Sequence, residues 1–286
     1  CLQRVNGFFA LAIYDKQEQS VFIARDRMGV KPLLIYKDDE KLMFASEMKA
    51  LIAMGIPKKI DEISLFTYLQ LNYIPAPQTI FKNVIKLMPG SYLKFLTASG
   101  RFNILESEFT PGNDNPGLTE KYYEIKGANT GLDYEGQQKM LVELLDASVQ
   151  RRLISDVPLG SFLSGGIDSS VIAALATRHT RHLKTFSIGF RDEPLFDETY
   201  YANLVAKKIG SDHTVFSLTT QDLFAHLHEV LDYTDEPFAD SSALNVHILS
   251  RQTRKHVTVA LSGDGADEMF GGYNKHAARS EEHTSE

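Results

Sequence analysis

The chain has 286 residues, of which 43% are hydrophobic and 23% are charged, so it has apolar material for a sizeable core and length for two domains. Its longest apolar runs, at 7–14 and 257–261, fall far short of the roughly 20 residues of a membrane helix, and no secretory leader is recognised. The net charge of −7 without a Lys/Arg cluster argues against nucleic-acid binding, and the single cysteine favours a reducing, cytoplasmic location.

The first hundred residues have the alternating apolar and polar pattern of short strands, bounded by charged or turn-forming residues. Short strands with tight connections favour an antiparallel sheet. The predicted strands cover residues 8–14, 20–24, 33–36 and 42–45. Ser46 is expected to cap a short helix that ends at Gly55. Asp61 is expected to cap a second helix, which Pro75 and Pro77 stop.

Residues 97–133 are rich in Gly, Pro and Asn, a composition that breaks regular structure and favours a linker. We therefore expect a first domain at 1–110, a linker at 111–133 and a second domain at 134–279. The closing residues 280–286 have no apolar face, and we expect them to be a non-native tail outside the fold.

Beyond the linker, the hydrophobic period changes from two to 3.6 residues, and helical segments alternate with short apolar strands. This alternation predicts right-handed strand–helix–strand units around a parallel sheet with helices on both faces. Ligands bind such sheets at the carboxyl ends of the strands. The expected strands lie at 162–163, 185–190, 214–218 and 257–261, and the expected helices at 141–152, 169–179, 198–209, 222–231 and 243–255.

The sharpest motif is Ser164-Gly165-Gly166-Ile167-Asp168-Ser169-Ser170, between an apolar strand and a helix. Its two glycines allow the backbone to approach an oxyanion closely, and the following helix presents unpaired N–H groups and a positive dipole end. Three serines add hydroxyl donors. Neither the lysine-bearing phosphate loop nor the dinucleotide pattern fits this sequence. The motif therefore predicts an anion-binding loop of another type.

A second loop has the same design, because the strand at 257–261 runs into Ser262-Gly263-Asp264-Gly265-Ala266-Asp267-Glu268. Both loops are expected to open at one edge of the sheet, where Asp168 and Asp267 share a Mg²⁺ with phosphate oxygens. One such turn alone is as often an ordinary strand–helix connection as a functional loop. Two of them at strand ends in one domain predict a nucleotide site.

These motifs resemble those of a known enzyme family, glutamine-hydrolysing asparagine synthetase of the class B type. The first loop is similar to the pyrophosphate loop of the ATP pyrophosphatases, and residues 261–268 are similar to the second loop of the synthetase. Landmarks of the family's glutaminase domain are matched in order by 25–33 (Arg-Asp-Arg-Met-Gly-Val-Lys-Pro-Leu), 44–51 (Phe-Ala-Ser-Glu-Met-Lys-Ala-Leu) and 86–92 (Lys-Leu-Met-Pro-Gly-Ser-Tyr). The likeness extends over most of the chain.

The resemblance implies a fold in two parts, α+β followed by α/β. The first part is the C-terminal portion of an N-terminal-nucleophile glutaminase domain, with antiparallel sheets and helices. The second is the N-terminal portion of an ATP pyrophosphatase domain, of the adenine nucleotide alpha hydrolase-like type, with a doubly wound parallel sheet. The resemblance leaves open a homodimer of the full-length protein.

The resemblance also implies a two-step reaction. The carboxylate of aspartate attacks the α-phosphate of ATP and releases pyrophosphate, and ammonia from glutamine then displaces AMP to give asparagine. Charge builds on the departing pyrophosphate, where Mg²⁺ and oriented donors act most strongly.

Roles for residues around the two loops follow from the same resemblance. Asp168 and Asp267 hold the metal, and Asp264 lies beside the reacting carboxylate. Some family members have Glu in place of Asp264, so two acceptors stay open: aspartate, or another carboxylate. A non-catalytic ATP-binding derivative is a third alternative. The residues expected to bind the nucleotide are Phe162, Leu163, Ser164, Gly165, Gly166, Asp168, Ser169, Ser170, Ile188, Ser262 and Gly263.

The family's glutaminase uses an N-terminal cysteine whose own amine serves as base. Cys1 is not expected to take this role, because residues 2–7 resemble the middle of the glutaminase domain. We expect an ordinary half-buried Cys1, glutamine-binding motifs upstream, and a lysine-bearing segment for pyrophosphate downstream. The chain alone is therefore expected to have no glutaminase activity, little or no synthetase turnover and weak Mg-ATP binding.

A few other polar residues carry weaker signals. The nine histidines are scattered, and His226 and His228 fall on different sides of a helix, so no zinc site is expected. Arg25 and Asp26 are expected to form a structural ion pair or a domain contact, because charged side chains within a strand–turn pattern need partners. The family resemblance favours a substrate-side loop for Asp240 and Ser241.

Overall fold

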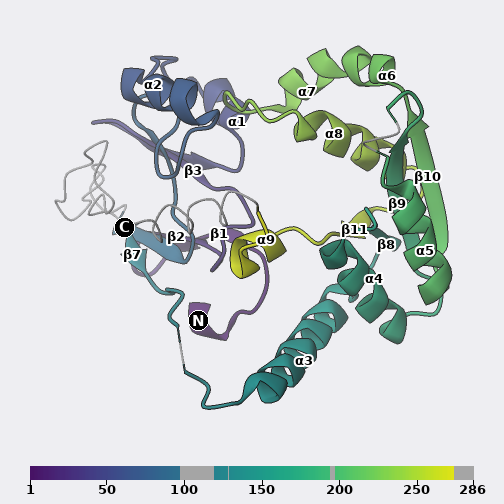
Figure 1. Cartoon of the computed structure of the whole chain (residues 1–286). Helices are drawn as coiled ribbons and strands as arrows, with labels where there is room; N and C mark the ends of the chain where they lie inside the picture. Colours follow the sequence, from purple (N-terminus) through teal and green to yellow (C-terminus); the bar gives the residue numbers. More distant parts are fainter. Residues whose placement is uncertain (97–118, 128, 194–196, 274–286) are drawn as a thin grey trace, which may run out of the picture. The chain divides into compact units, whose positions relative to one another are not determined.

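The computed structural model describes residues 1–96, 119–127, 129–193 and 197–273. The chain divides into two units, which are coloured along the sequence in Figure 1. Unit 1 comprises Cys1–Ala128 and Asp232–Asp240, and unit 2 comprises Asn129–Leu231 and Ser241–Glu286. Among the described residues, no helix is both long enough and apolar enough to cross a membrane.

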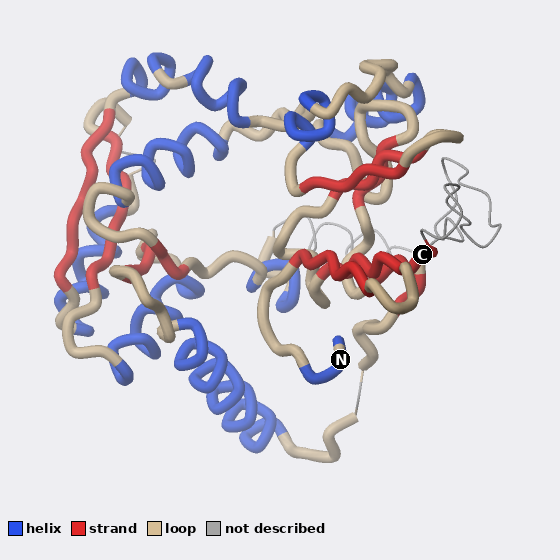
Figure 2. The backbone as a smooth tube through the Cα atoms, turned by 180° about the vertical axis from the view of Figure 1, so that it is seen from behind, coloured by secondary structure: helices blue, strands red, loops and turns tan. Residues whose placement is uncertain are grey.

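Unit 1 is built on two antiparallel sheets, drawn among the red strands of Figure 2. The first has the order β1-β2-β6-β7 and the second the order β4-β3-β5. The antiparallel arrangement predicted from the first hundred residues is confirmed. The strands are β1 (Ala10–Asp15), β2 (Ser20–Arg25), β3 (Leu34–Lys37), β4 (Leu42–Ala45), β5 (Val84–Lys86), β6 (Ser91–Leu96) and β7 (Glu120–Lys121).

Alternating side chains of the strands build two cores in unit 1. Ile23, Ile35 and Leu93 are almost fully buried in one core, and Tyr36 and Met48 are almost fully buried in the other. Successive residues of a strand point to opposite faces of the sheet. Ile35 and Tyr36 of β3 therefore serve different cores, and the sheet that contains β3 is covered on both faces.

Part of the predicted linker, 111–133, has regular structure. Strand β7 lies within it and pairs with Ser91 and Tyr92 of β6. Asp133 at its end caps the next helix, since its carboxylate accepts a hydrogen bond from the Gly136 N–H at 2.9 Å. The part of the linker before residue 119, and the predicted tail at 280–286, lie outside the described residues.

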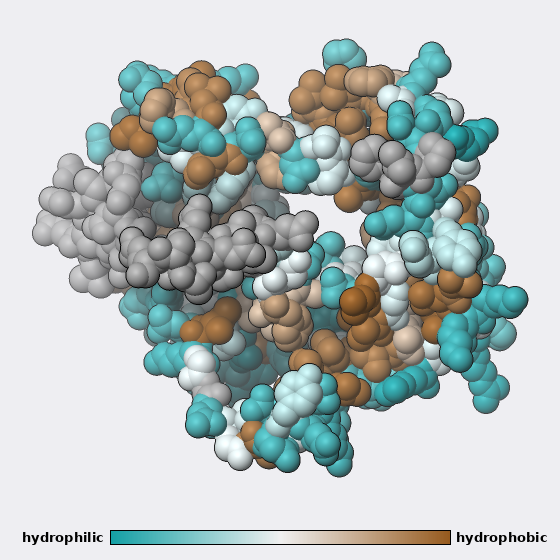
Figure 3. Space-filling view, in the orientation of Figure 1, coloured by the Kyte–Doolittle hydropathy of each residue, from teal (hydrophilic) through white to brown (hydrophobic). Residues whose placement is uncertain are grey.

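Helix α2 (Glu62–Leu71) begins at the predicted cap. The Asp61 carboxylate accepts a hydrogen bond from the Ser64 N–H at 2.8 Å. The helix ends at Asn72, which has a left-handed conformation, ahead of the predicted stop at Pro75. Its outer face is part of the brown surface in Figure 3 and exposes Ile63, Phe66 and Leu69.

Helix α1 (Met48–Ala53) is capped from a distant part of the chain. The predicted cap, Ser46, is wrong, because the helix follows Glu47, whose side chain makes no capping hydrogen bond. Instead, the Asp235 carboxylate accepts a hydrogen bond from the Met48 N–H at 2.8 Å, across 187 residues of sequence. A cap so distant leaves no signal in the local pattern.

The segment Asp232–Asp240 makes further contacts within unit 1. The Glu236 carboxylate forms an ion pair with the Lys86 ammonium group of β5. The Ala239 N–H donates a hydrogen bond to the Asn72 carbonyl at 2.9 Å. The segment is therefore held by α1, by β5 and by the turn that follows α2.

Arg25, the last residue of β2, and Asp26 organise the turn that follows this strand. An ion pair or a domain contact was expected, and among the described residues no ion pair joins the two side chains. Asp26 is 1% exposed. Its carboxylate accepts hydrogen bonds from the N–H groups of Met28, Val30 and Lys31. The Arg25 guanidinium donates to the carbonyls of Gly29, Lys31 and Leu87.

Cys1 precedes the short helix η1 (Leu2–Arg4) and is exposed, so the expectation of a half-buried Cys1 is wrong.

Unit 2 is built on a parallel sheet with the order β10-β9-β8-β11, which confirms the predicted parallel sheet. Its strands are β8 (Leu159–Phe162), β9 (Lys184–Phe190), β10 (Asp212–Leu218) and β11 (Val259–Leu261). The helices of this half of the chain are α3 (Tyr134–Arg152), α4 (Ile167–His179), α5 (Thr199–Ile209), α6 (Thr220–Ala225), α7 (Leu227–Tyr233), α8 (Ser242–Thr253) and α9 (Ala266–Phe270).

Both faces of the parallel sheet are covered. On one face, a β-carbon added at Gly189 of β9 would contact Thr199 of α5. On the other face, the ring of Phe186 lies against the rings of Phe216 and His256, and His256 follows α8. Gly189 and Phe186 are an odd number of positions apart in β9, so they point to opposite faces. The sheet is doubly wound, as predicted.

The helix predicted at 222–231 is two helices, α6 and α7, with a break at His226. Thr219 and Asp222 cap the start of α6 reciprocally. The Asp222 N–H donates to Thr219 Oγ1 at 3.2 Å, and the Thr219 N–H donates to Asp222 Oδ2 at 2.8 Å. The other predicted helices of unit 2 differ from the structure only at their ends.

Candidate functional site

Two loops follow the carboxyl ends of neighbouring parallel strands in unit 2. β8 and β11 pair directly, with Ser161 opposite Leu261, and Ser161 Oγ donates to the Leu261 carbonyl at 3.3 Å. The chain leaves β8 through residues 163–166 into α4, and leaves β11 through residues 262–265 into α9. Adjacent parallel strands therefore deliver both predicted loops to one edge of the sheet.

Gly165 fixes the path of the first loop. Its φ is +88°, in the left-handed region that favours glycine. A β-carbon at this position would lie 2.6 Å from the backbone nitrogen of Ala202 and 2.7 Å from the β-carbon of Tyr201, both in α5. No larger residue fits without displacing α5, so the first loop is packed directly against that helix.

Serine hydroxyl groups close the first loop. Ser164 Oγ and Ser169 Oγ lie 2.9 Å apart, and the Ser164 N–H donates to Ser169 Oγ at 3.2 Å. The Gly166 N–H donates to Ser164 Oγ at 3.3 Å. Ser170 Oγ donates to the Gly166 carbonyl at 2.6 Å, which ties it to the helix backbone. The loop is thus ordered by its own side chains.

The amino end of α4 lies at this loop. Gly166 is its N-cap residue, and no side chain caps the helix. Asp168 is half-buried in the first turn, and Ser169 is buried. The first N–H groups of a helix have no partner within the helix, and the helix dipole is positive at this end. An uncapped amino end of this kind favours a phosphate group.

Gly263 brings the second loop onto the first. A β-carbon at Gly263 would lie 2.7 Å from the Ser169 nitrogen and 2.9 Å from the carbonyl carbon and the β-carbon of Asp168. A side chain at this position would separate the two loops. Of the residues predicted from the sequence, the structure therefore brings Asp168, Ser169 and Gly263 into contact.

The acids of the second loop have different surroundings. Ser262 Oγ donates to Asp264 Oδ2 at 2.8 Å, and Asp267 is half-buried in the first turn of α9. The Tyr273 hydroxyl donates to Glu268 Oε1 at 2.7 Å. This hydrogen bond, followed by desolvation and the charges of the nearby acids, raises the pKa of Tyr273 to about 12. Tyr273 therefore remains protonated at neutral pH, as a donor to the acidic loop.

Three other predicted residues lie on or directly after the strands beside the loops. Leu163 is fully buried, and its N–H donates to the Phe186 carbonyl at 2.8 Å. That N–H is used by the sheet and is not available to a ligand. Phe162 ends β8, and Ile188 lies in the carboxyl half of β9; both are half-buried.

Comparison with protein families matches each half of the chain separately. Residues 140–286, just over half of the chain, match the family model described as Asparagine synthase. The chain belongs to the asparagine synthase family. Residues 1–104 match the model described as Glutamine amidotransferase domain.

Curated relatives of this asparagine synthase chain align with nearly all of it. Asparagine synthetase [glutamine-hydrolyzing] 1 of Bacillus subtilis is 35% identical over 274 residues, which are 95% of this chain and 40% of that protein. Asparagine synthetase [glutamine-hydrolyzing] 3 of the same organism is 29% identical and covers 96% of this chain and 44% of that protein. Amidase chyE of Penicillium rubens is 26% identical, and the alignment covers 96% of this chain and 41% of that protein. The chain spans about two fifths of the length of these relatives.

Among solved structures, the NMN synthetase from Francisella tularensis aligns with 50% of this chain and 59% of its own, at 19% identity and a TM-score of 0.34. A likeness at this level carries no argument about the asparagine synthase chain.

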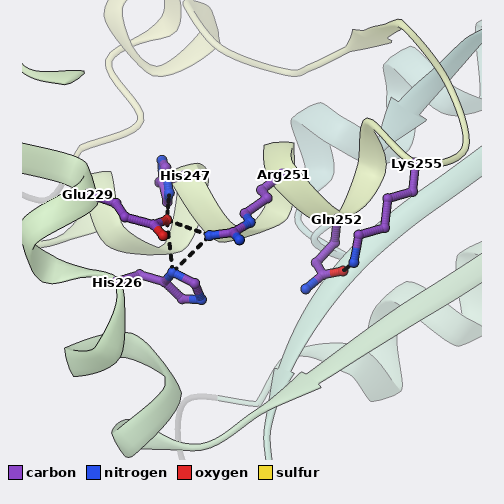
Figure 4. A network of polar contacts seen from close by, with 6 residues as sticks. All are labelled: His226, Glu229, His247, Arg251, Gln252 and Lys255. Atoms are coloured by element: carbon purple, nitrogen blue, oxygen red, sulfur yellow. Dashed lines mark hydrogen bonds and ion pairs between the residues drawn. The ribbon is translucent and has the colours of Figure 1, made fainter. Parts of the chain in front are cut away.

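One cluster in the asparagine synthase half was not predicted from the sequence (Figure 4). Glu229 Oε2 lies 3.0 Å from His226 Nδ1 and 3.1 Å from His247 Nε2, and it accepts a hydrogen bond from Arg251 Nη1 at 2.5 Å. Arg251 first, and then the two imidazoles, lower the pKa of Glu229 to about 2. The available signal was helical spacing, since His226 and Glu229 are three residues apart and His247 and Arg251 are four apart. That the two pairs meet depends on how the helices pack.

Proposed function

We propose that this chain carries the ATP site of an enzyme that forms an amide from a carboxylate and ammonia. The side-chain carboxylate of aspartate attacks the α-phosphorus of ATP, the bond to the bridging oxygen breaks, and pyrophosphate leaves. Ammonia then attacks the acyl carbon of the aspartyl adenylate, loses a proton and displaces AMP to give asparagine. The observation that carries this proposal is the contact of Gly263 with Asp168 and Ser169, which joins the two loops at one edge of the sheet.

The first loop suits the leaving pyrophosphate. Its helix has an uncapped amino end, and the hydroxyl groups of Ser164 and Ser169 are held beside each other before any ligand binds. Negative charge on the pyrophosphate grows as the bond breaks, so donors fixed in advance stabilise the transition state more than the ground state. We assign to the phosphate chain the residues Ser164, Gly165, Gly166, Ser169 and Ser170.

The donor set around the loops fits Mg²⁺. Asp168 and Asp267 are half-buried carboxylates, each in the first turn of the helix that follows its loop. Mg²⁺ in nucleotide sites commonly takes one or two carboxylates together with phosphate oxygens and water. We propose these two residues as its protein ligands. When bound with ATP, the ion neutralises charge on the departing pyrophosphate.

The strand ends suit the adenosine part of ATP. We assign it to the backbone of Phe162, Leu163 and Ile188, together with Ser262 and Gly263 of the second loop. Because the Leu163 N–H donates to the sheet, Leu163 has only its carbonyl to offer from the backbone. We assign Asp264 as the catalytic residue of the second loop, where its carboxylate lies beside the reacting carboxylate of the substrate. Its hydrogen bond from Ser262 supports this role by limiting the positions of its carboxylate.

Unit 1 is proposed to be part of the glutaminase that supplies ammonia from glutamine. The match of residues 1–104 to a glutamine amidotransferase domain supports this assignment. We propose a cytoplasmic setting, where the single cysteine of the chain stays reduced.

Titration of ATP into the protein, with and without Mg²⁺, tests the nucleotide site. The unmodified chain is expected to bind ATP in a Mg²⁺-dependent manner, and Asp168→Asn is expected to weaken binding by about tenfold through loss of a charged contact. Asp212→Asn is the matched control, because Asp212 is an exposed carboxylate at the amino end of β10, away from the carboxyl ends that form the loops. Absence of Mg²⁺-dependent binding, or an equal loss in the control, would overturn the proposal.

A second candidate keeps the chemistry but uses another carboxylate as acceptor. Two observations favour it: the short acid Asp264, and a relative that is named an amidase. Non-hydrolysable sulfamoyl-adenosine analogues that carry aspartyl or glutamyl groups separate the two candidates by binding alone. An aspartate enzyme is expected to bind the aspartyl analogue more tightly than AMP and more tightly than the glutamyl analogue. Equal binding of both analogues would favour the other acceptor.

A further inference from the structure

Three metal-ligating side chains meet in unit 2, outside the two loops (Figure 4). His226 lies at the break between α6 and α7, Glu229 lies in α7, and His247 lies in α8. Their ligand atoms all lie within 4.8 Å of one another, and all three side chains are half-buried. In the part of the chain that the structure describes, no other group of three His, Cys, Asp or Glu residues meets in this way.

Two of the three distances between these atoms suit a small tetrahedral ion, and the two imidazole nitrogens lie within 4.8 Å of each other. Glu229 Oε2 lies 3.0 Å from His226 Nδ1 and 3.1 Å from His247 Nε2. Two ligands of a tetrahedral Zn²⁺, each bonded at about 2.0–2.1 Å, are separated by about 3.3 Å. These pairs therefore need to move apart only slightly to admit such an ion.

The chemistry of the donors selects the class of ion. Two imidazole nitrogens and one carboxylate form a set that zinc uses when a fourth position is left to water. Mg²⁺ and Ca²⁺ prefer oxygen donors, and imidazole suits divalent transition metals. The cluster therefore differs in kind from the pair of carboxylates assigned to the nucleotide.

Arg251 places a positive charge on this cluster in the present structure. Its Nη1 atom lies 2.5 Å from Glu229 Oε2 and 3.2 Å from His226 Nδ1, so a cationic nitrogen contacts two of the three ligand groups. Its side chain is 49% exposed. A long, half-exposed side chain can turn into solvent at modest cost, because exposed ion pairs contribute little to stability. Arg251 therefore acts as the counterion that a metal would replace.

We propose that His226 Nδ1, the Glu229 carboxylate and His247 Nε2 bind one divalent transition metal of the zinc type, which displaces Arg251. Bound metal joins the break between α6 and α7 to α8, and so fixes two helices that otherwise meet through side-chain contacts. The proposal does not depend on the function assigned to the two loops.

Co²⁺ is the probe, because its visible absorption reports both binding and tetrahedral geometry. The full chain, stripped of metal with a chelator, is titrated with Co²⁺, and Zn²⁺ is then added as a competitor. We expect one site per chain, tetrahedral absorption and displacement by Zn²⁺. His247→Ala and His226→Ala are each expected to weaken binding by more than about tenfold. His228→Ala is the matched control, since His228 is exposed in α7 and is expected to leave binding unchanged.

Arg251→Met separates a metal site from a purely structural ion-pair cluster. Removal of the competing cation is expected to tighten Co²⁺ binding by roughly fivefold, whereas loss of a structural residue would not strengthen it. Circular dichroism without metal establishes that each variant is folded. The proposal is overturned if neither the unmodified chain nor the Arg251 variant gives tetrahedral absorption, or if the His228 control loses as much affinity as the His247 variant.

Discussion

Gly165 has a φ in the left-handed region, and a β-carbon added to it would clash with the backbone of Ala202 in α5. Gly165→Ala is expected to lower the free energy of unfolding by about 3 kcal/mol, because backbone strain and a clash with Ala202 add together. Gly210 is the matched control: its φ is +68°, but nothing lies within 4 Å of an added β-carbon. Gly210→Ala is expected to cost only about 1 kcal/mol. Urea unfolding measures both losses, and equal losses would refute the packing of the first loop against α5.

His213 gives unit 2 a dependence of stability on pH. Its Nδ1 lies 2.9 Å from Thr185 Oγ1 and its Nε2 lies 3.2 Å from Ser187 Oγ. Burial lowers the pKa of His213 below the ordinary value of 6.5, although a hydrogen bond with the backbone of Thr185 acts in the opposite direction. The unfolded chain therefore binds the proton first as pH falls. The stabilisation is complete above pH 6.5 and is lost as pH falls from there through the folded pKa.

Urea unfolding at about pH 7 and about pH 5 measures this effect. We expect the free energy of unfolding to fall less across this interval in His213→Gln than in the unmodified protein. His182→Gln is the control, because His182 is exposed and is expected to leave the decline unchanged. The same decline in the His213 variant and the unmodified protein would contradict the assignment.

Residues were predictable where their signal is local. Glycines and serines between a strand and a helix indicated both loops, because close backbone approach and hydroxyl donors need those residue types at that place. Partners that are distant in sequence were not predictable. Arg251 meets Glu229 and His226, which lie 22 and 25 residues away in sequence. The Arg25 guanidinium donates to the Leu87 carbonyl, 62 residues away.

Helix α1 depends on a residue outside its own half of the sequence. Asp235→Ala removes the carboxylate that accepts the Met48 N–H, and it is expected to lower the free energy of unfolding by about 1 kcal/mol, as loss of a helix cap does. Asp232→Ala is the control, because Asp232 is exposed in the same segment. Hydrogen exchange of the Met48 amide reports the effect directly. Unchanged exchange in the Asp235 variant would show that this contact does not cap the helix.

Elements with a clear alternation were predictable even when short, as the four-residue strands β3 and β4 were, and elements without one were not. Strands β5 and β6 lie among proline and glycine residues, which hid their alternation. The break between α6 and α7 occupies one residue, His226, and periodicity over a window of many residues cannot resolve it.

The class of each half was predictable, because alternation of strands and helices dictates a parallel sheet, and short alternating strands dictate an antiparallel one. The composition of unit 1 was not predictable. Residues Asp232–Asp240 run from the last residues of α7 towards α8, yet they belong to unit 1 through the contacts of Asp235, Glu236 and Ala239. Contacts of this range are decided by packing and leave no periodic signal.

The proposed ATP-dependent reaction depends on the two loops acting on one metal-bound nucleotide. The most direct test is a double-mutant cycle that measures Mg-ATP affinity for Asp168→Asn, Asp267→Asn and the two changes together. If both carboxylates hold one ion, each single change weakens binding by about tenfold, and the double variant is little weaker than either. Independent effects that multiply to about a hundredfold, or a single change without effect, would contradict a shared site.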